Sequence, residues 1–132
     1  MAYKYEKLEK LSDGDVKAFF KITEFWGLTE REQTDLLGKS DFHFMILKGF
    51  FKKLAKGNFI YVKEDIYKRI TCVIDIYVAL IGIFGLSSQS ANAWIKKPND
   101  APFLKGKTAL QFMISEGAEG MKKVYNYLRG AQ

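Results

Sequence analysis

The sequence predicts an all-helical protein, and three observations lead to that prediction. Proline occurs only twice, at positions 98 and 102. The segments between glycine, proline and asparagine have the lengths of helices, about 8 to 20 residues. Hydrophobic residues make up 48% of the 132 residues, which is ample for one packed core, with or without a small appendage.

Residues 63–84 predict a long central helix around which the rest of the chain is organised. Polar and apolar residues alternate at near-helical spacing up to Asp75, whereas residues 76–84 have no polar side chain. A membrane span needs roughly 20 apolar residues, and the charges before position 76 leave only about half of that. Protein must therefore cover the apolar end. Even its outward positions are apolar, which predicts a homodimer interface at Val78, Ile81 and Phe84.

The N-terminal part divides into a polar lead-in, residues 1–11, and a helical region, residues 12–62. Ser12 or Asp13 can cap a helix whose apolar face is built from residues 16–25. The lead-in lacks the apolar core of a signal peptide, and one cysteine forms no disulfide framework, so we expect a cytoplasmic location. The run 58–62 favours β structure and could form a short strand or an extended connector.

Residues 12–62 have the layout of a helix-turn-helix. Thr29 and Glu32 form a capping box, Gly38 ends that short helix, and Ser40 caps a longer helix over residues 41–56. Lysines 48, 52 and 56 are four apart and are expected on one helix face, where they could meet phosphates or simply face solvent. The residues that the layout predicts for DNA binding are Lys39, Ser40, His43, Lys48, Lys52 and Lys53.

The sequence that follows the central helix predicts a series of shorter helices. Gly85 ends the central helix, and Ser87 can cap a short helix that carries Trp94. A loop over residues 97–107 follows, and Thr108 begins the next helix. Two glycines break the chain before a last helix: Gly117 and Gly120.

No combination of residues predicts catalysis. His43 is the single histidine, so a Ser-His-Asp assembly would depend on it, and no second ligand stands at metal spacing. Cys72 lies among apolar residues, which predicts a buried, unreactive thiol. We therefore expect a binding protein rather than an enzyme, with no metal and no cofactor. The net charge of +6 permits an acidic partner without identifying one.

Two stretches of the second half form a recognisable pattern: residues 93–99, AWIKKPN, and residues 103–110, FLKGKTAL. With Gly120 and the closing segment 124–130, they resemble the toxin-binding domain of the MbcA/ParS/Xre antitoxin family. That family has a Trp, a Pro-Asn a few residues on, a Gly-x-[Thr or Ser]-Pro-Leu helix start and a closing Val-x-x-x-Leu-x-x-Gly-like helix. Residues 63–130 match this pattern well, with Ala109 in place of the common proline.

The resemblance implies Xre-like helix-turn-helix helices in residues 12–62, followed by a long central helix and a toxin-binding domain in residues 63–132. It implies a RES-domain toxin as partner, which consumes NAD or transfers ADP-ribose and is held inactive by the C-terminal domain. It also implies homodimers, and operator DNA as a second partner through which the operon is autoregulated.

The family motif consists of Trp94, Pro98, Asn99, Gly106 and Thr108, for which we expect structural roles: a core side chain, a helix stop and a tied turn among them. The toxin contact is expected on the polar side of the last helix and on the tail, where Arg or Lys suits a pocket that holds the pyrophosphate of NAD. Its residues are Lys123, Asn126, Tyr127, Arg129, Gly130, Ala131 and Gln132.

Two other functions fit the same residues. The chain could be a stand-alone helix-turn-helix transcription regulator without a toxin, or a helical adaptor that uses its aromatic helix over residues 41–56 to bind another protein. A neighbouring gene for a RES-domain protein would separate the antitoxin from the stand-alone regulator.

Overall fold

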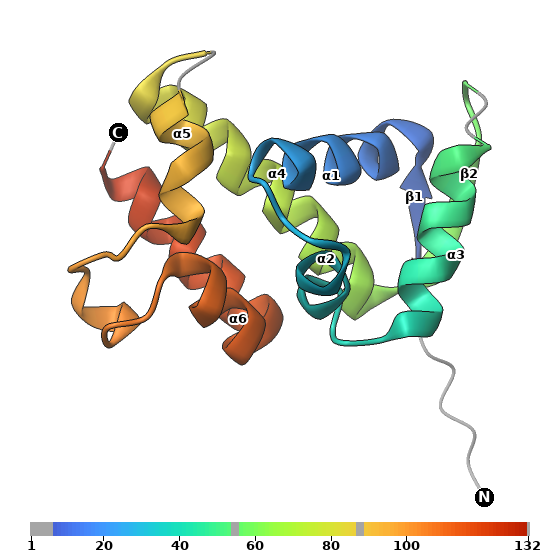
Figure 1. The fold of residues 1–132 in the computed structure, drawn as a ribbon. Helices are drawn as coiled ribbons and strands as arrows, with labels where there is room; N and C mark the ends of the chain where they lie inside the picture. The colour runs from blue at the N-terminus through green and yellow to red at the C-terminus, as the bar shows by residue number, and fades with distance from the viewer. Residues whose placement is uncertain (1–6, 54–55, 87–88, 132) are drawn as a thin grey trace, which may run out of the picture.

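The computed structural model describes residues 7–53, 56–86 and 89–131, and over these residues the protein is mostly helical with one small two-stranded sheet (Figure 1). The prediction of a helical fold is confirmed, and the sheet is the departure from it. The elements in chain order are β1 (Leu8–Ser12), α1 (Asp13–Phe25), α2 (Glu30–Leu36), α3 (Asp41–Lys52), β2 (Phe59–Lys63), α4 (Glu64–Phe84), α5 (Gln89–Ala93), the 3-10 turns η1 (Trp94–Lys96) and η2 (Pro102–Leu104), and α6 (Ala109–Gly130).

The sheet corrects the prediction of a polar lead-in over residues 1–11. Strand β1 pairs antiparallel with β2, from Leu8 opposite Lys63 to Ser12 opposite Phe59. Leu11 is completely buried, because its side chain points from the strand toward the core. The β-favouring run at residues 58–62 does form a strand, and its partner is the segment for which no structure was predicted.

The predicted helix starts are confirmed where the structure describes them. The hydroxyl of Ser12 accepts a hydrogen bond from the Asp15 amide at 3.1 Å, and Ser40 accepts one from the His43 amide at 3.2 Å. The pair of Thr29 and Glu32 forms a complete capping box. These bonds satisfy amides at helix starts that have no partner within the helix. Ser87, the predicted cap of the tryptophan helix, lies outside the described residues.

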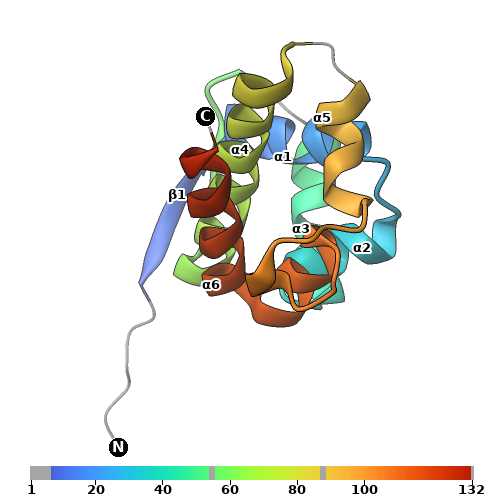
Figure 2. The ribbon, with the colours of Figure 1, turned by 90° about the vertical axis from the view of Figure 1, so that its left-hand side faces the viewer.

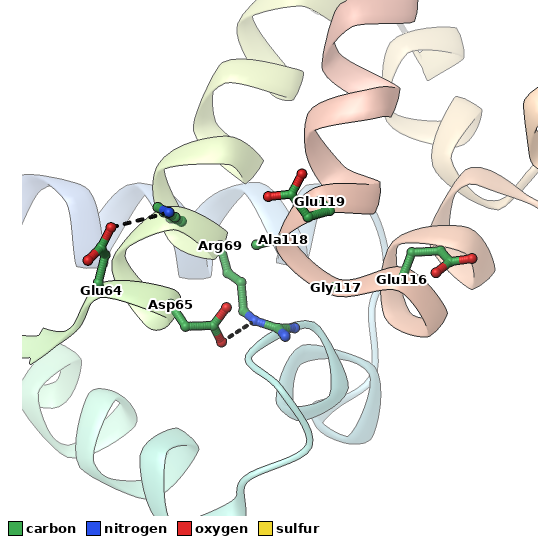
Figure 3. Close-up of a pocket in the computed structure, with 8 residues that line it drawn as sticks. Glu64, Asp65, Arg69, Glu116, Gly117, Ala118 and Glu119 are labelled. Carbon is green, nitrogen blue, oxygen red and sulfur yellow. Dashed lines mark hydrogen bonds and ion pairs between the residues drawn. The ribbon is translucent and has the colours of Figure 1, made fainter. Parts of the chain in front are cut away.

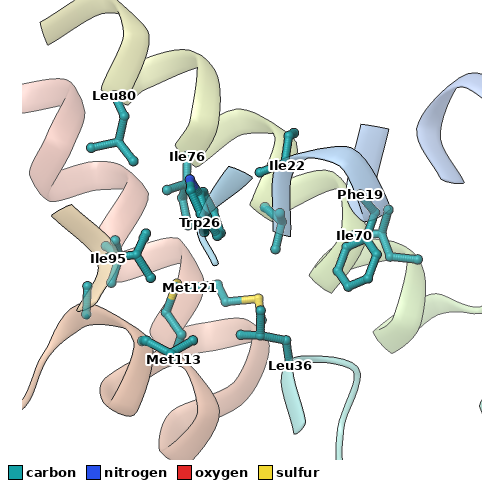
Figure 4. Packing of buried hydrophobic residues seen from close by; sticks show 14 of the residues in the cluster. Phe19, Ile22, Trp26, Leu36, Ile70, Ile76, Leu80, Ile95, Met113 and Met121 are labelled. Carbon is teal, nitrogen blue, oxygen red and sulfur yellow. The ribbon is translucent and has the colours of Figure 1, made fainter. Parts of the chain in front are cut away.

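Helix α4 is the centre of the molecule, as predicted. Its buried side, which includes Ile70, Ile76 and Leu80, packs against α1 and α6 (Figure 4). Figure 2 shows the end of α6 running beside α4. The buried cluster joins side chains of residues 12–62 and 63–132, so the two predicted regions share one core. Among the described residues, no helix is both long and apolar enough to cross a membrane.

Helix α6 is bent at Gly117, where φ is 71° and ψ is −149°. The break before the last helix was predicted at Gly117 and Gly120, and the structure places it at Gly117 alone. Gly120 is helical and buried, and a Cβ there would lie 3.3 Å from the Phe112 carbonyl oxygen. The first glycine thus changes the direction of the chain, and the second allows close packing.

Helix α3 ends at Lys52, one turn earlier than predicted. Lys56 therefore lies outside the helix, so the predicted face of lysines 48, 52 and 56 does not form. The following turn contains Gly57, whose φ of 86° belongs to the left-handed region and leads into β2.

Candidate functional site

Arg69 lies at the junction of α2, α4 and α6 (Figure 3). Its side chain is only 14% exposed. Nε donates a hydrogen bond to the Asp65 carboxylate at 2.8 Å, and Nη1 donates one to the Leu36 carbonyl oxygen at 3.2 Å. A Cβ on Gly117 would lie 2.9 Å from Nη2, so the bend of α6 approaches the same guanidinium. Arg69 thus connects the N-terminal helices to the bend.

A cleft beside Arg69 opens between the start of α4 and the bend of α6 (Figure 3). The two cations that line the cleft both form ion pairs with carboxylates of α4: Lys68 pairs with Glu64 at 3.2 Å, and Arg69 pairs with Asp65. Glu116 and Glu119 line the opposite side. The described part of the chain contains no group of His, Cys, Asp and Glu side chains that could hold a metal ion. The cleft offers carboxylates but no set of metal ligands.

The predicted toxin-binding residues come together on the second half of α6. Lys123, Asn126, Tyr127 and Gly130 are spaced as one row along the helix and are exposed; we call this row the α6 outer face. The opposite side of the helix, with Met121, Val124 and Leu128, is buried.

Other contacts fix the surroundings of the α6 outer face. The Tyr127 ring lies 5.3 Å from the Phe103 ring, so the face extends onto η2. Arg129 lies in the neighbouring row, with its guanidinium carbon 5.8 Å from the Tyr125 ring centre. Ala131 follows the helix and is exposed, and Gln132 lies outside the described residues.

A groove runs between α4 and the second half of α6 on the surface of the protein. It is lined by Cys72 and Asp75 on α4 and by Lys122 and Tyr125 on α6. Burial, and secondarily the Asp75 carboxylate, raise the pKa of the Cys72 thiol to about 11. The thiol is therefore protonated at neutral pH and unreactive, as predicted, although the residue is half-buried rather than buried. Burial also raises the pKa of Asp75.

Among the predicted dimer residues on α4, Val78 lies on the side turned away from the buried side, whereas Phe84 follows the buried Leu80 by one helical turn. Val78 is 62% exposed and Phe84 is 39% exposed, while Ile81 is half-buried. Val78 and Ile81 continue a row of alternating four- and three-residue steps, which is the spacing of a helix–helix seam. We call this row the α4 outer row: Tyr67, Thr71, Ile74, Val78 and Ile81.

The predicted DNA-binding residues are dispersed. Ser40 is used as a cap, and the buried Nδ1 of His43 has no hydrogen-bond partner among the described residues. The Lys48 ammonium lies over the rings of Phe20 and Phe51, at 4.9 and 5.6 Å from their centres. Lys39, Lys52 and Lys53 are exposed, the first before α3 and the other two at its end.

The family-motif residues lie at turns and at the start of α6. Trp94 packs partly buried against the core, and the chain leaves its 3-10 turn just before Pro98. The Asn99 side chain accepts a hydrogen bond from the Ala101 amide at 2.9 Å, which ties the turn. Gly106 has a φ of 82°, and Thr108 caps α6 through a capping box.

Two side chains that the sequence analysis did not single out connect the halves of the molecule, Arg69 and Lys96. Lys96 donates a hydrogen bond to the Gly27 carbonyl oxygen at 2.8 Å and pairs with Glu32 at 3.1 Å. Burial opposes ionisation of Glu32, but the Thr29 amide and Lys96 outweigh it and lower the pKa of that carboxyl. The four-residue spacing of Asp65 and Arg69 could have indicated an ion pair. No local sequence pattern indicates the partners of Arg69 and Lys96 that are distant in the chain.

Comparison with known proteins finds one similar protein. A stretch of 115 residues, 86% of this chain, is 31% identical to the uncharacterized protein y4oB of Sinorhizobium fredii (strain NBRC 101917 / NGR234) and covers 81% of that protein. No family model matches the chain.

Proposed function

We propose that this chain, which belongs to the family of the uncharacterized protein y4oB of Sinorhizobium fredii, is the antitoxin of a type II toxin–antitoxin system. Its target is a RES-domain toxin that consumes NAD or transfers ADP-ribose. The proposal rests on the resemblance of residues 63–130 to the toxin-binding domain of the MbcA/ParS/Xre family. The observation that supports it best is the α6 outer face, an exposed polar row on a helix whose other side is buried in the core.

Neutralisation would work by occupying the entrance of the toxin's NAD site. Lys123 and Arg129 are both exposed at the end of α6, next to the chain end. At the entrance, outside the groups that bind the pyrophosphate, these cations would form charge-assisted hydrogen bonds with acidic side chains or carbonyl oxygens of the toxin. Trp94, Asn99 and Thr108 act indirectly, because they fix the turns and the helix start that hold α6 in place.

The same proposal includes a cytoplasmic homodimer that autoregulates its operon. The α4 outer row supports the homodimer, because a mostly apolar row with seam spacing, in which Val78 is exposed and the other residues are half-buried, suits a second helix. Operator binding by α2 and α3, the helix-turn-helix-like pair, has weaker support. Of the residues predicted to bind DNA, only Lys39, Lys52 and Lys53 are exposed lysines that could contact phosphates.

An inhibition assay with the toxin encoded beside this gene tests the antitoxin function. The full chain in excess should stop NAD consumption. A chain without residues 129–132, and a chain with Lys123→Glu and Arg129→Glu, should leave the toxin about tenfold or more active, because charge pairs lost from a buried contact weaken binding strongly.

The matched control is Lys17→Glu with Lys21→Glu, which places the same charge change on the exposed side of α1 and should inhibit like the unchanged chain. Full inhibition by both altered chains would remove the toxin contact from the end of α6. No inhibition by the unchanged chain would refute the antitoxin function itself.

A helical adaptor is the second candidate, and one observation favours it over a stand-alone transcription regulator. Two residues on the outward side of α3, Phe42 and Met45, are apolar and largely exposed. Base edges are read mainly by polar side chains, so this surface suits a protein better than an operator. The inhibition assay separates the adaptor from the antitoxin.

A further inference from the structure

Helix α3 presents an apolar row to solvent. Phe42 is 68% exposed, Met45 is 70% exposed and Ile46 is 42% exposed, whereas Leu47 on the other side is buried. Gly49 continues the row at the same helical spacing, and no atom lies within 4 Å of the place where its Cβ would be. We call these four residues the α3 ridge. Contiguous exposed apolar surface of this kind marks an interaction site.

The α3 ridge has a shape that is complementary to itself. The largest side chain, Phe42, stands one residue after the start of α3, and the missing side chain, at Gly49, stands three residues before its end. When two such helices lie antiparallel across a two-fold axis between Met45 and Ile46, each Phe42 ring meets the open space over Gly49 of the other copy. Met45 and Ile46 then fill the centre, and apolar knobs pack into holes as they do in helix pairs.

The charges at the two ends of α3 are complementary in the same arrangement. Asp41, in the first turn, has a side chain that is 72% exposed and lies 3.4 Å from Arg31. Lys52, in the last turn, lies on the same flank of the helix as Asp41 and Met45, because the three are separated by four and seven residues. An antiparallel pair therefore places Asp41 of each copy beside Lys52 of the other, and it also opposes the two helix dipoles.

We propose that the α3 ridge binds the α3 ridge of a second copy of this chain, with the two helices antiparallel. This contact goes beyond the proposed function, because it is separate from the α4 outer row and needs no toxin. Two different two-fold contacts on one chain produce assemblies larger than a dimer. The contact also covers the side of α3 that would enter a DNA groove, so operator binding through α3 and this pairing exclude each other.

Charge reversal tests the pairing in solution. The experiments use a chain with Val78→Glu, which disables the α4 outer row, and sedimentation velocity over about 10 to 300 µM, the range suited to a small interface. This chain should form a dimer. Asp41→Lys and Lys52→Asp should each weaken the dimer about fivefold, whereas the double variant should restore it, because opposite charges again face each other across the axis.

A cross-link gives a second, independent readout. Met45→Cys in a Cys72→Ser chain should form a disulfide-linked dimer under mild oxidation, because Met45 of each copy lies next to the two-fold axis. Lys17→Cys, exposed on α1, is the matched control and should stay monomeric.

Circular dichroism confirms that each variant is folded before its result is used. A monomer at the highest concentration, a double variant as weak as the single ones, or cross-linking no greater than in the control would overturn the pairing. So would a Phe42→Ser variant that loses affinity for duplex DNA while its sedimentation is unchanged. None of these results bears on toxin inhibition, so the failure of this inference is distinguishable from the failure of the antitoxin function.

Discussion

Arg69 shows how one side chain connects segments that are distant in sequence. Its guanidinium donates hydrogen bonds to the Asp65 carboxylate within its own helix and to the Leu36 carbonyl oxygen at the end of α2. It also lies close to the backbone at Gly117. An arginine suits this place because its planar, always charged group donates in several directions at once. The bend of α6, and with it the direction of the α6 outer face, depends on this close approach.

Gly117→Ala should destabilise the protein by about 2 kcal/mol or more. The φ and ψ angles of Gly117 belong to a region that is almost restricted to glycine, where other residues are strained by about 1 to 3 kcal/mol. The added methyl group would also lie 2.9 Å from Arg69 Nη2. Urea denaturation measures the change in the free energy of unfolding.

The control for this substitution is Gly14→Ala in the first turn of α1, where the added methyl group meets only ordinary contacts. It should leave stability unchanged or raise it by up to about 1 kcal/mol, the helix preference of alanine over glycine. Equal stabilities of the two variants would contradict the role assigned to the bend.

At the scale of elements, α4 has two different apolar sides. One side is buried against α1 and α6, and on the other, the α4 outer row, Val78 is exposed while the remaining residues are half-buried. The sequence already indicates that this helix is apolar on more than one side, since residues 76–84 lack polar side chains. It does not say which side the core uses, because both sides have helical spacing.

Val78→Glu should leave the chain folded but abolish association through the α4 outer row, so that only the α3 contact remains. Val78 is largely exposed, so a carboxylate there remains hydrated in the monomer but is buried and unpaired in the dimer. Sedimentation measures the association and circular dichroism measures the fold. In contrast, Ile76→Glu places the same charge at a fully buried position and should unfold the chain.

Two results would contradict an interface on the α4 outer row. One is an Asp41→Lys chain, in which the α3 contact is weakened, that sediments as a monomer. The other is loss of structure in Val78→Glu, which would assign that side chain to the core.

At the scale of the whole molecule, one core joins the two regions that the sequence separates. Phe19 and Ile22 of α1 belong to the same buried cluster as Met113 and Met121 of α6, with α4 between them (Figure 4). Lys96 adds a polar connection from η1 to Gly27 and Glu32.

The protein should therefore unfold in a single transition. Trp26 lies in the first region and Trp94 in the second, so Trp26→Phe and Trp94→Phe each leave one fluorescent reporter. Both reporters and far-ultraviolet circular dichroism should give the same urea midpoint, after correction for the stability of each variant. Separate midpoints within one variant would show that residues 12–62 and 63–132 unfold independently.

The sequence by itself determined the features that depend on neighbouring residues. Ser12, Thr29, Ser40 and Thr108 cap helices because the amides they bind are three residues away. Likewise, Asn99 ties its own turn. Such bonds form within a few residues, so their pattern is readable without a fold.

Only the tertiary structure decided which segments meet and which apolar sides remain outside. Strand β1 forms because β2 lies beside it, and Arg69 finds Leu36 and Gly117 only after three helices have packed. Of the lysines expected on one face of α3, Lys48 is drawn over Phe20 and Lys56 lies beyond the helix, while Phe42 and Met45 face solvent beside the exposed Lys52. These outcomes depend on contacts between residues far apart in the chain, which local spacing does not encode.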